Sequence, residues 1–429
     1  MDYILSEKMC YRLYQDFTIV LHHGTGKYLR MNKSAGEIIK RLDEGEKSFS
    51  DSELDFIRQL KKHQIVVEEN KLPEHRIEAS NSKPSAEPRI LTDLNSYAKE
   101  RLIPLNCQIE LTYRCGLKCK HCYLGNEKPD VTKEMSTDEI KQFIDELADL
   151  GGLFLTLTGG EAFARSDLEE IYLHARKRRF AVSVLTSGWG VKLDLLERLV
   201  GYGMDSAQVS IHGYDQQSHD AFTMKNGSFN AAMATLIKLK QLGVMVRAAV
   251  SVHQENYHCI DKILELLDKN EIVHSFNVNM LPTLTGKTTN QDLQLTEGQI
   301  EKIAGIKPVR SRFRMSELSA DDYVCGAGRS VISLNPYGEV YPCINLRKSL
   351  GNIREKSFTE IWKLPQQNSS IRNLKFKDLA DCPECEKRAY CNRCTGIAAM
   401  QGLSIKDHSV LDCVQATVYS KAYHDSGKV

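Results

Sequence analysis

The stretch QIELTYRCGLKCKHCYLG, residues 108–125, decides how the rest of the chain is interpreted. Its first five residues predict a strand, and three cysteines follow at positions 115, 119 and 122. By chance, a C-x3-C-x2-C spacing would arise in such a chain with a probability of roughly 0.01. Three thiolates on a four-iron cluster leave one iron without a protein ligand, open to another molecule. The stretch therefore predicts a [4Fe–4S] site held by Cys115, Cys119 and Cys122.

A zinc site is the alternative for these cysteines. Cys3His sites combine three thiolates with one imidazole, and His121 lies inside the motif. His121 is adjacent to Cys122, which places its imidazole poorly for closing a tetrahedron with that cysteine. We favour iron–sulfur and keep zinc open as the alternative.

Outward from the motif, strand and helix candidates alternate. The further strands are expected at residues 153–160, 181–188, 206–213, 244–252 and 275–281. Amphipathic segments separate them, and Ser136 with Glu139 three residues later predicts the cap of the first helix. Six β–α repeats predict an α/β fold, in which right-handed crossovers curl a parallel sheet into a partial (β/α)6 TIM-like barrel over residues 106–312. Active sites of such sheets lie at the carboxyl ends of the strands, where the cysteine motif falls.

With Tyr123 after its last cysteine, the motif resembles the signature of radical S-adenosylmethionine (SAM) enzymes. The resemblance implies that SAM chelates the open iron and is cleaved reductively to a 5′-deoxyadenosyl radical, with no catalytic group beyond the cluster. It also implies SAM contacts at the strand ends. The residues are Tyr123, Gly159, Gly160, Glu161, Ser187 and Ser210. Glu161 is expected to accept from the SAM ammonium, and the two serines are expected to bind the ribose hydroxyls. Many relatives have Asn and Asp where this chain has Ser187 and His212.

Seven more cysteines follow in residues 313–429, a region rich in loops, where little core is expected and the short strands need external staples. Their spacing resembles the SPASM extension of radical SAM peptide and protein maturases, which implies two auxiliary iron–sulfur clusters. One would use Cys382, Cys385, Cys391 and Cys413. The other would use Cys325, Cys343 and Cys394, with its fourth ligand missing or supplied from elsewhere. The pattern normally has three residues where this chain has only Asn392 and Arg393. Zinc ribbons are the alternative.

Residues 1–72 predict a small α+β module, and residues 73–105 a linker. Strands are expected at 18–24 and 27–32, followed by a helix that stops at Gly45, then a second helix running into a strand. This order resembles the PqqD-like winged-helix element that recognises leader peptides in ribosomal peptide biosynthesis. Such an element captures the leader as an added strand at a sheet edge. A capping or dimerisation domain is the alternative.

Composition excludes several classes of function. Lys and Arg (57) balance Asp and Glu (56), so we expect no nucleic-acid partner, and no apolar run predicts a membrane span. The thirteen cysteines are an odd number in a chain without an export signal, which favours metal sites in a cytoplasmic protein over disulfides. Cys10, Cys107 and Cys259 stand apart and are expected to be buried apolar residues.

These expectations combine into a peptide maturase acting on a leader-bearing precursor, with an external electron donor of the flavodoxin or ferredoxin type. A thioether crosslink from a precursor cysteine is the first choice. Carbon–carbon or ether crosslinking, epimerisation and maturation of a folded protein, as in anaerobic sulfatase activation, are alternatives. A zinc-binding peptide adaptor without catalysis is the alternative of another class.

Overall fold

The computed structural model describes most of the chain. The described residues are 3–22, 27–69, 89–125, 129–204, 206–284, 290–304, 306, 319–364 and 370–425.

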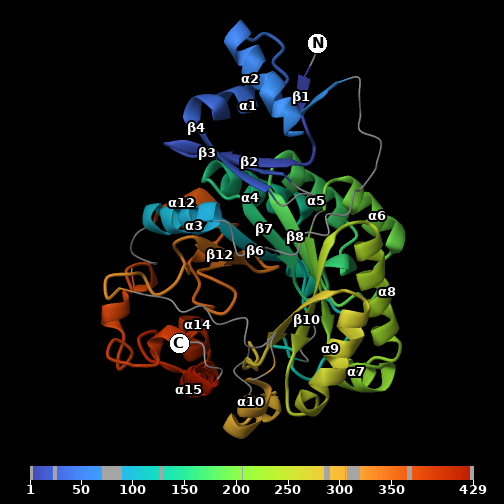
Figure 1. Cartoon of the computed structure of the whole chain (residues 1–429), viewed down its shortest axis with the longest axis vertical. Coiled ribbons are helices and arrows are strands. Elements are labelled where there is room, and N and C mark those ends of the chain that lie inside the picture. The colour runs from blue at the N-terminus through green and yellow to red at the C-terminus, as the bar shows by residue number, and fades with distance from the viewer. Residues whose placement is uncertain are drawn as a thin grey trace.

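Six consecutive parallel strands form the centre of the molecule (Figure 1), as the sequence predicts. They are β6 (Asn106–Glu110), β7 (Phe154–Thr158), β8 (Ala181–Thr186), β9 (Ser206–Ile211), β10 (Met245–Ser251) and β11 (Val273–Asn277). Each strand pairs in parallel with the next in sequence. All their carboxyl ends therefore lie at one edge of the sheet.

Helices connect these strands. They are α4 (Thr137–Asp149), α5 (Leu168–Lys177), α6 (Leu193–Gly201), α7 (Gln216–Thr223), α8 (Ser228–Gln241), α9 (Ile260–Lys269) and α10 (Glu297–Ala304). The predicted cap of α4 is confirmed, because Ser136 and Glu139 form a capping box. Cys107 and Cys259 are buried, as expected, and so is Cys10 in the N-terminal module.

The N-terminal module contains the predicted strands and helices and two strands more. Its elements are β1 (Tyr3–Leu5), β2 (Met9–Leu13), β3 (Phe17–His22), β4 (Lys27–Asn32), α1 (Lys33–Asp43), α2 (Asp51–Lys62) and β5 (Val66–Glu68). β2, β3 and β4 form an antiparallel sheet with β4 at one edge, and β1 pairs with β5. Gly45 has a φ of 84° just after α1, as expected for a helix stop.

The linker prediction is wrong for residues 89–101, which form helix α3 (Arg89–Arg101). Leu94 and Ala98 of this helix are buried against one face of the module sheet. The helical period is present in the sequence, at Ile90, Leu91, Leu94, Tyr97 and Ala98, but it directly follows a polar stretch with three prolines that is typical of a linker. Residues 70–88 of the expected linker lie outside the described residues.

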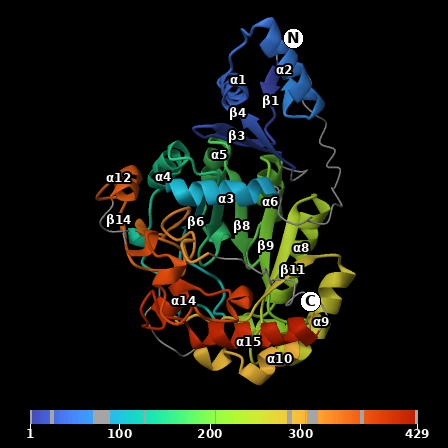
Figure 2. The ribbon, with the colours of Figure 1, turned by 60° about the vertical axis from the view of Figure 1, so that its left-hand side comes forward.

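The module is fixed to the end of the barrel where the strands begin (Figure 2). Leu153, directly before β7, packs in the same cluster as Ile19 and Leu21 of β3. Two arginines just before β8 add polar contacts: Arg176 donates to the Glu7 carbonyl oxygen at 2.6 Å, and Arg179 pairs with Asp43. The module therefore lies at the opposite end of the sheet from the cysteine motif.

The C-terminal region extends the central sheet. β12 (Val331–Leu334) pairs in parallel with β6, and β13 (Glu339–Tyr341) and β14 (Gly351–Asn352) follow antiparallel. Ile332 and Leu334 are fully buried in the main core, so the expectation that this region has little core is wrong here.

Helices of the described residues complete the C-terminal region. They are α12 (Phe358–Lys363), α14 (Thr395–Met400) and α15 (Val410–Asp425), and α15 lies along α10 (Figure 2). Within the described residues, no helix combines the length and apolarity needed to cross a bilayer.

Candidate active site

The three cysteines of the first motif lie on the loop that follows β6. Cys115 is exposed, whereas Cys119 and Cys122 are half-buried. Burial, with smaller effects of neighbouring acidic groups and thiols, raises the pKa of Cys115 to about 11 and that of Cys119 to about 12. The three thiols are therefore neutral unless a positively charged group binds them. Iron ions supply such a charge, and a bound metal ion deprotonates its thiol ligands. The donor set of three thiols fits the expected cluster.

The loop after β7 supports the chain that leads into Cys115. Gly160 donates its backbone N–H to the Thr112 carbonyl at 2.7 Å, and the backbone N–H of Glu161 donates to Arg114 at 2.9 Å. Gly159 has a φ of 143°, and a Cβ atom there would lie 2.2 Å from the Thr112 carbonyl oxygen. The predicted close approach is thus to the protein's own backbone.

We expect Gly159→Ala to lower the iron content and to slow SAM cleavage at least ~10-fold, or ~1.4 kcal/mol. The added Cβ must push the Thr112 backbone away and thereby displace the cysteine loop. Iron analysis and chromatography of 5′-deoxyadenosine measure the effect. Gly190→Ala is the matched control, because Gly190 also has a positive φ but open space around it. Equal behaviour of the two variants would contradict the steric argument.

The carboxylate of Glu161 is buried and held by the end of β8. It accepts from the Thr186 hydroxyl at 2.7 Å, from the backbone N–H and hydroxyl of Ser187 at 2.8 and 2.5 Å, and from the Phe163 N–H at 3.2 Å. These four donors fill the acceptor sites of a carboxylate. Burial raises its pKa, an effect that the hydrogen bonds oppose. Glu161 and Ser187 thus bind each other in this structure. The expected contacts of either side chain with SAM stay predictions, and they require the Ser187 hydroxyl to rotate away from Glu161. Ser210 is half-buried on β9, one strand further on.

Tyr123 takes part in a buried ionic cluster that the sequence did not reveal. Its hydroxyl donates to Glu110 at 2.5 Å, and Arg347 donates two hydrogen bonds to the same carboxylate, at 2.6 and 2.8 Å. Tyr113 adds a fourth donor at 3.1 Å. Burial and the Glu110 charge raise the pKa of Tyr123 well above its ordinary value. The cluster ties the C-terminal region to the end of β6, and a SAM contact from Tyr123 stays a prediction.

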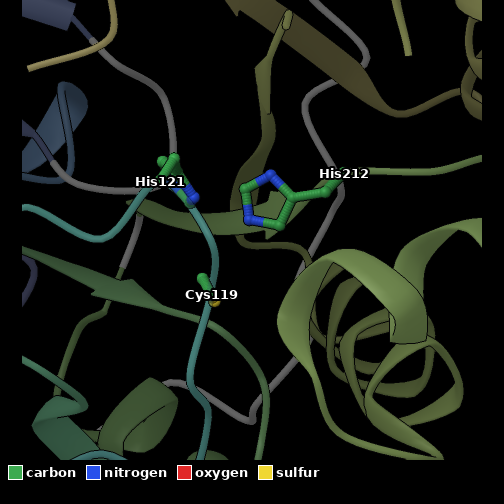
Figure 3. A group of neighbouring side chains, drawn as sticks. All are labelled: Cys119, His121 and His212. Carbon is green, nitrogen blue, oxygen red and sulfur yellow. The ribbon is translucent and has the colours of Figure 1, made fainter. Parts of the chain in front are cut away.

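A group of histidines lies beside the cysteine loop (Figure 3). The ligand atoms of Cys119, His121 and His212 are within 4.8 Å of one another, with His212 directly after β9. The Nδ1 atoms of His121 and His212 and the Nε2 atom of His253 are buried without a hydrogen-bond partner in the described structure. Burial lowers the pKa of His121 to about 4 and that of His253 to about 3. Two neutral imidazoles beside Cys119 also suit zinc, but Cys119 belongs to the three-cysteine motif, so this group is part of the same site.

His219 makes folding sensitive to acid. Burial lowers its pKa to about 4, and its Nδ1 atom accepts from the His212 backbone N–H at 3.2 Å. Above pH 6.5 the folded and unfolded states are both neutral here. As the pH falls below 6.5, only the unfolded chain binds the proton, so stability is lost until about pH 4.

We expect His219→Asn to reduce the loss of unfolding free energy between pH 7.5 and pH 5 by about 2 kcal/mol. Urea titrations at the two pH values measure it. Replacing the exposed His63 by Asn should leave the wild-type loss unchanged. An identical loss in the His219 variant would show that another group is responsible.

The C-terminal cysteines surround a cavity of about 500 Å³. Cys382, Cys385, Cys391 and Cys413 line it, and Cys413 comes from α15. Burial raises the pKa of Cys391 to about 12, with added effects from Asp412 and from the thiols of Cys413 and Cys382. Four thiols around one cavity fit the four-cysteine cluster expected from the sequence.

The second expected group also comes together. Burial, together with the nearby thiols of Cys325 and Cys394, raises the pKa of Cys343 to about 12. The Cys394 thiol also faces the Asn345 amide, which lies 3.8 Å away. The structure thus brings together each set of cysteines that the sequence assigned, while the choice of ligands stays a prediction.

Two family models match the chain. The Radical SAM superfamily model covers residues 109–267, and the SPASM model, an iron–sulfur cluster-binding domain, covers residues 325–395. The chain is 27% identical over 400 residues to the antilisterial bacteriocin subtilosin biosynthesis protein AlbA of Bacillus subtilis, covering 86% of this chain and 84% of AlbA. It is 25% identical over 317 residues to the AdoMet-dependent heme synthase of Nitratidesulfovibrio vulgaris, covering 66% of this chain and 85% of that protein.

A solved structure shares the whole architecture. Streptococcus suis SuiB bound to S-adenosylmethionine aligns with a TM-score of 0.61 and 14% identity, over 95% of this chain and 99% of SuiB. Alignment over that share must include most of residues 1–72. The N-terminal module therefore has a counterpart in that fold, and the partial barrel and the cysteine-rich C-terminal region follow in the expected order.

Proposed function

Because the chain is a radical SAM enzyme with an iron–sulfur cluster-binding SPASM domain, we propose that it crosslinks a ribosomally made precursor peptide. The observation that carries the proposal is the combination of the three-cysteine site with a small module whose β4 lies at a sheet edge. AlbA, which by its name serves biosynthesis of a bacteriocin, is similar over most of its length. The heme synthase match covers a smaller share of this chain.

Each group of residues has one task in this proposal. When bound, the cluster and SAM supply the 5′-deoxyadenosyl radical that removes a hydrogen atom from the peptide. Cys115, Cys119 and Cys122 hold the cluster. The backbone bonds of Gly160 and Glu161 fix the loop that carries Cys115. An external flavodoxin or ferredoxin in the cytoplasm would deliver the electron.

The bond we propose first is a thioether between a precursor cysteine and a carbon atom. Such a bond removes two hydrogens from the peptide: one leaves as an atom to the radical, and the other leaves as a proton and an electron. Cys325, Cys343 and Cys394 would hold one auxiliary cluster with three thiolates, which would leave a ligand position for the precursor thiolate, and the auxiliary clusters would supply an acceptor for the electron. Carbon–carbon or ether bonds are the second candidate, since the electron balance is the same.

The mass of the modified peptide tests this chemistry. The reduced holoenzyme, SAM and short peptides encoded beside this chain's gene are incubated, and peptide mass is followed together with 5′-deoxyadenosine. A thioether predicts a loss of two hydrogens and a cysteine that no longer reacts with iodoacetamide. Loss of two hydrogens with a reactive cysteine would support the other crosslinks, and an unchanged mass with inverted stereochemistry would mean epimerisation. A colourless protein holding zinc would overturn the enzyme in favour of an adaptor.

We further propose that the leader peptide binds as an added strand along β4. β4 is an outer strand, and among its residues Lys27, Arg30 and Asn32 are exposed. A strand laid along it gains backbone hydrogen bonds, while the side chains beside it select the sequence. A module that binds an extended strand favours a peptide substrate over a folded protein substrate such as a sulfatase.

We expect the leader to slow amide hydrogen exchange at Leu29–Asn32 at least about tenfold, since a new ladder bond must open before exchange. Mass spectrometry of the full chain with and without the peptide measures it. β2, at the other edge of the sheet, is the internal control. Its Arg12 side chain donates to the Gly152 and Arg178 carbonyls of the barrel, so its exchange should not change. Protection of β2 alone would contradict binding at β4.

A further inference from the structure

The cavity lined by the four C-terminal cysteines has a basic lining. Besides the thiols, its walls carry Lys387, Arg388, Arg393 and His408. A four-iron cluster with four thiolates is an anion that gains one more negative charge on reduction. Cations around it therefore favour the reduced form, and the effect is largest for charges that are close and shielded from water.

Arg393 is the basic side chain that the structure holds most firmly. Its Nη1 donates to the Thr395 hydroxyl at 2.9 Å, and its Nη2 donates to the carbonyls of Ile405, at 2.8 Å, and Asp407. Its Nε is buried and meets no acceptor at hydrogen-bonding geometry among the described residues. The guanidinium is thus fixed in place by three hydrogen bonds, and its Nε–H stays available as a donor, which the sulfur atoms of a cluster can accept.

Arg393 is also close to both groups of cysteines. It is placed in sequence between Cys391 of one group and Cys394 of the other. Cys325 and Cys382, one from each group, pack against the same hydrophobic cluster. The guanidinium of Arg393 lines the cavity of the four-cysteine group, and it donates to the hydroxyl of Thr395, the residue directly after Cys394 of the other group. One fixed charge therefore acts on both sites.

We infer that Arg393 is a cation shared by the two auxiliary clusters and that it raises the reduction potential of both. Two acceptors biased by the same charge are both easier to reduce, which suits the removal of the surplus electron after crosslinking. The inference rests on the proposed assignment of the cysteines to two clusters. Arg393 acts here through its charge on the clusters and is not proposed to contact the substrate.

Redox titration of the reconstituted full-length protein, followed by electron paramagnetic resonance, tests the inference. Arg393→Gln should lower the equilibrium constant for one-electron reduction of both auxiliary clusters at least tenfold, or 59 mV. The catalytic cluster should not shift. Lys406→Gln removes an exposed charge from the loop that Arg393 contacts and should leave all potentials unchanged. A shift below tenfold, or a shift of one auxiliary cluster alone, would overturn the shared charge.

Two further variants keep the test decisive. If Arg393→Gln fails to assemble its clusters, Arg393→Lys keeps the charge. The reduction potentials of this variant should stay within 59 mV of the wild-type values, which is a tenfold change in the equilibrium constant. A larger shift would overturn the role of charge. Cys382→Ala should remove one auxiliary signal together with the iron of one cluster. An unchanged iron content would overturn the ligand assignment, separately from the role of Arg393.

Discussion

Cys119→Ala will reduce 5′-deoxyadenosine formation to background and will lower the iron content by one cluster. Two thiolates cannot hold the four-iron cluster with its open iron, and this loop offers only Cys115 and Cys122 besides. The reduced protein is incubated with SAM under anaerobic conditions, and the nucleoside is measured by chromatography. Among the predicted changes, this is the one with the largest effect on catalysis.

Cys259→Ala is the matched control for that loss. Cys259 is a buried cysteine of the same domain, and its thiol donates to the Asn256 carbonyl at 3.2 Å, so its removal should leave iron and product almost unchanged. Undiminished nucleoside from the Cys119 variant would sink the radical assignment. Zinc in place of iron, lost on replacing His212, would instead favour the group of Cys119, His121 and His212 as a metal site.

Arg347→Met will lower the free energy of unfolding by about 3–5 kcal/mol, because it leaves the Glu110 carboxylate as a buried charge without its cation. Glu110 is fully buried, and the side chain of Arg347 is 14% exposed. The two remaining donors, Tyr113 and Tyr123, are neutral and do not compensate the charge. Urea denaturation of wild type and variant measures the difference.

Arg354→Met is the comparison for this variant. Arg354 pairs with Glu139 across the same two regions, but their side chains are 38% and 32% exposed. A pair in contact with water contributes roughly 1 kcal/mol or less. Equal losses in the two variants would mean that the burial of Glu110 carries no special cost.

The central sheet was predictable from the sequence because its signals are local. Each apolar run is bounded by turn residues, and the Ser136 and Glu139 cap is a pattern within four residues. Parallel pairing then brings the strand ends together, so the positions of Cys115 and Glu161 at one edge follow from topology.

Other parts of the site depend on contacts between distant residues. Glu110 and Arg347 are 237 residues apart, and no local pattern links a strand residue to a loop cation so far along the chain. Helix α3 was missed because its short apolar period directly follows a polar stretch with three prolines, a composition that indicates a linker. His121 and His212 come together although their loops follow β6 and β9, two strands that β7 and β8 separate in the sheet.

The position of the N-terminal module has a consequence for which precursors can be modified. A leader bound at β4 would lie at the amino-terminal ends of the barrel strands. The three-cysteine site lies at the carboxyl ends of these strands, on the other side of the barrel. A strand of six residues spans about 20 Å, so an extended peptide needs more than about six residues to pass it, and more if it runs around the outside. Precursor residues closer to the leader would not reach the three-cysteine site, whatever their side chains. If the leader binds at β4 as proposed, the modified residue would be selected by its distance from the leader along the precursor.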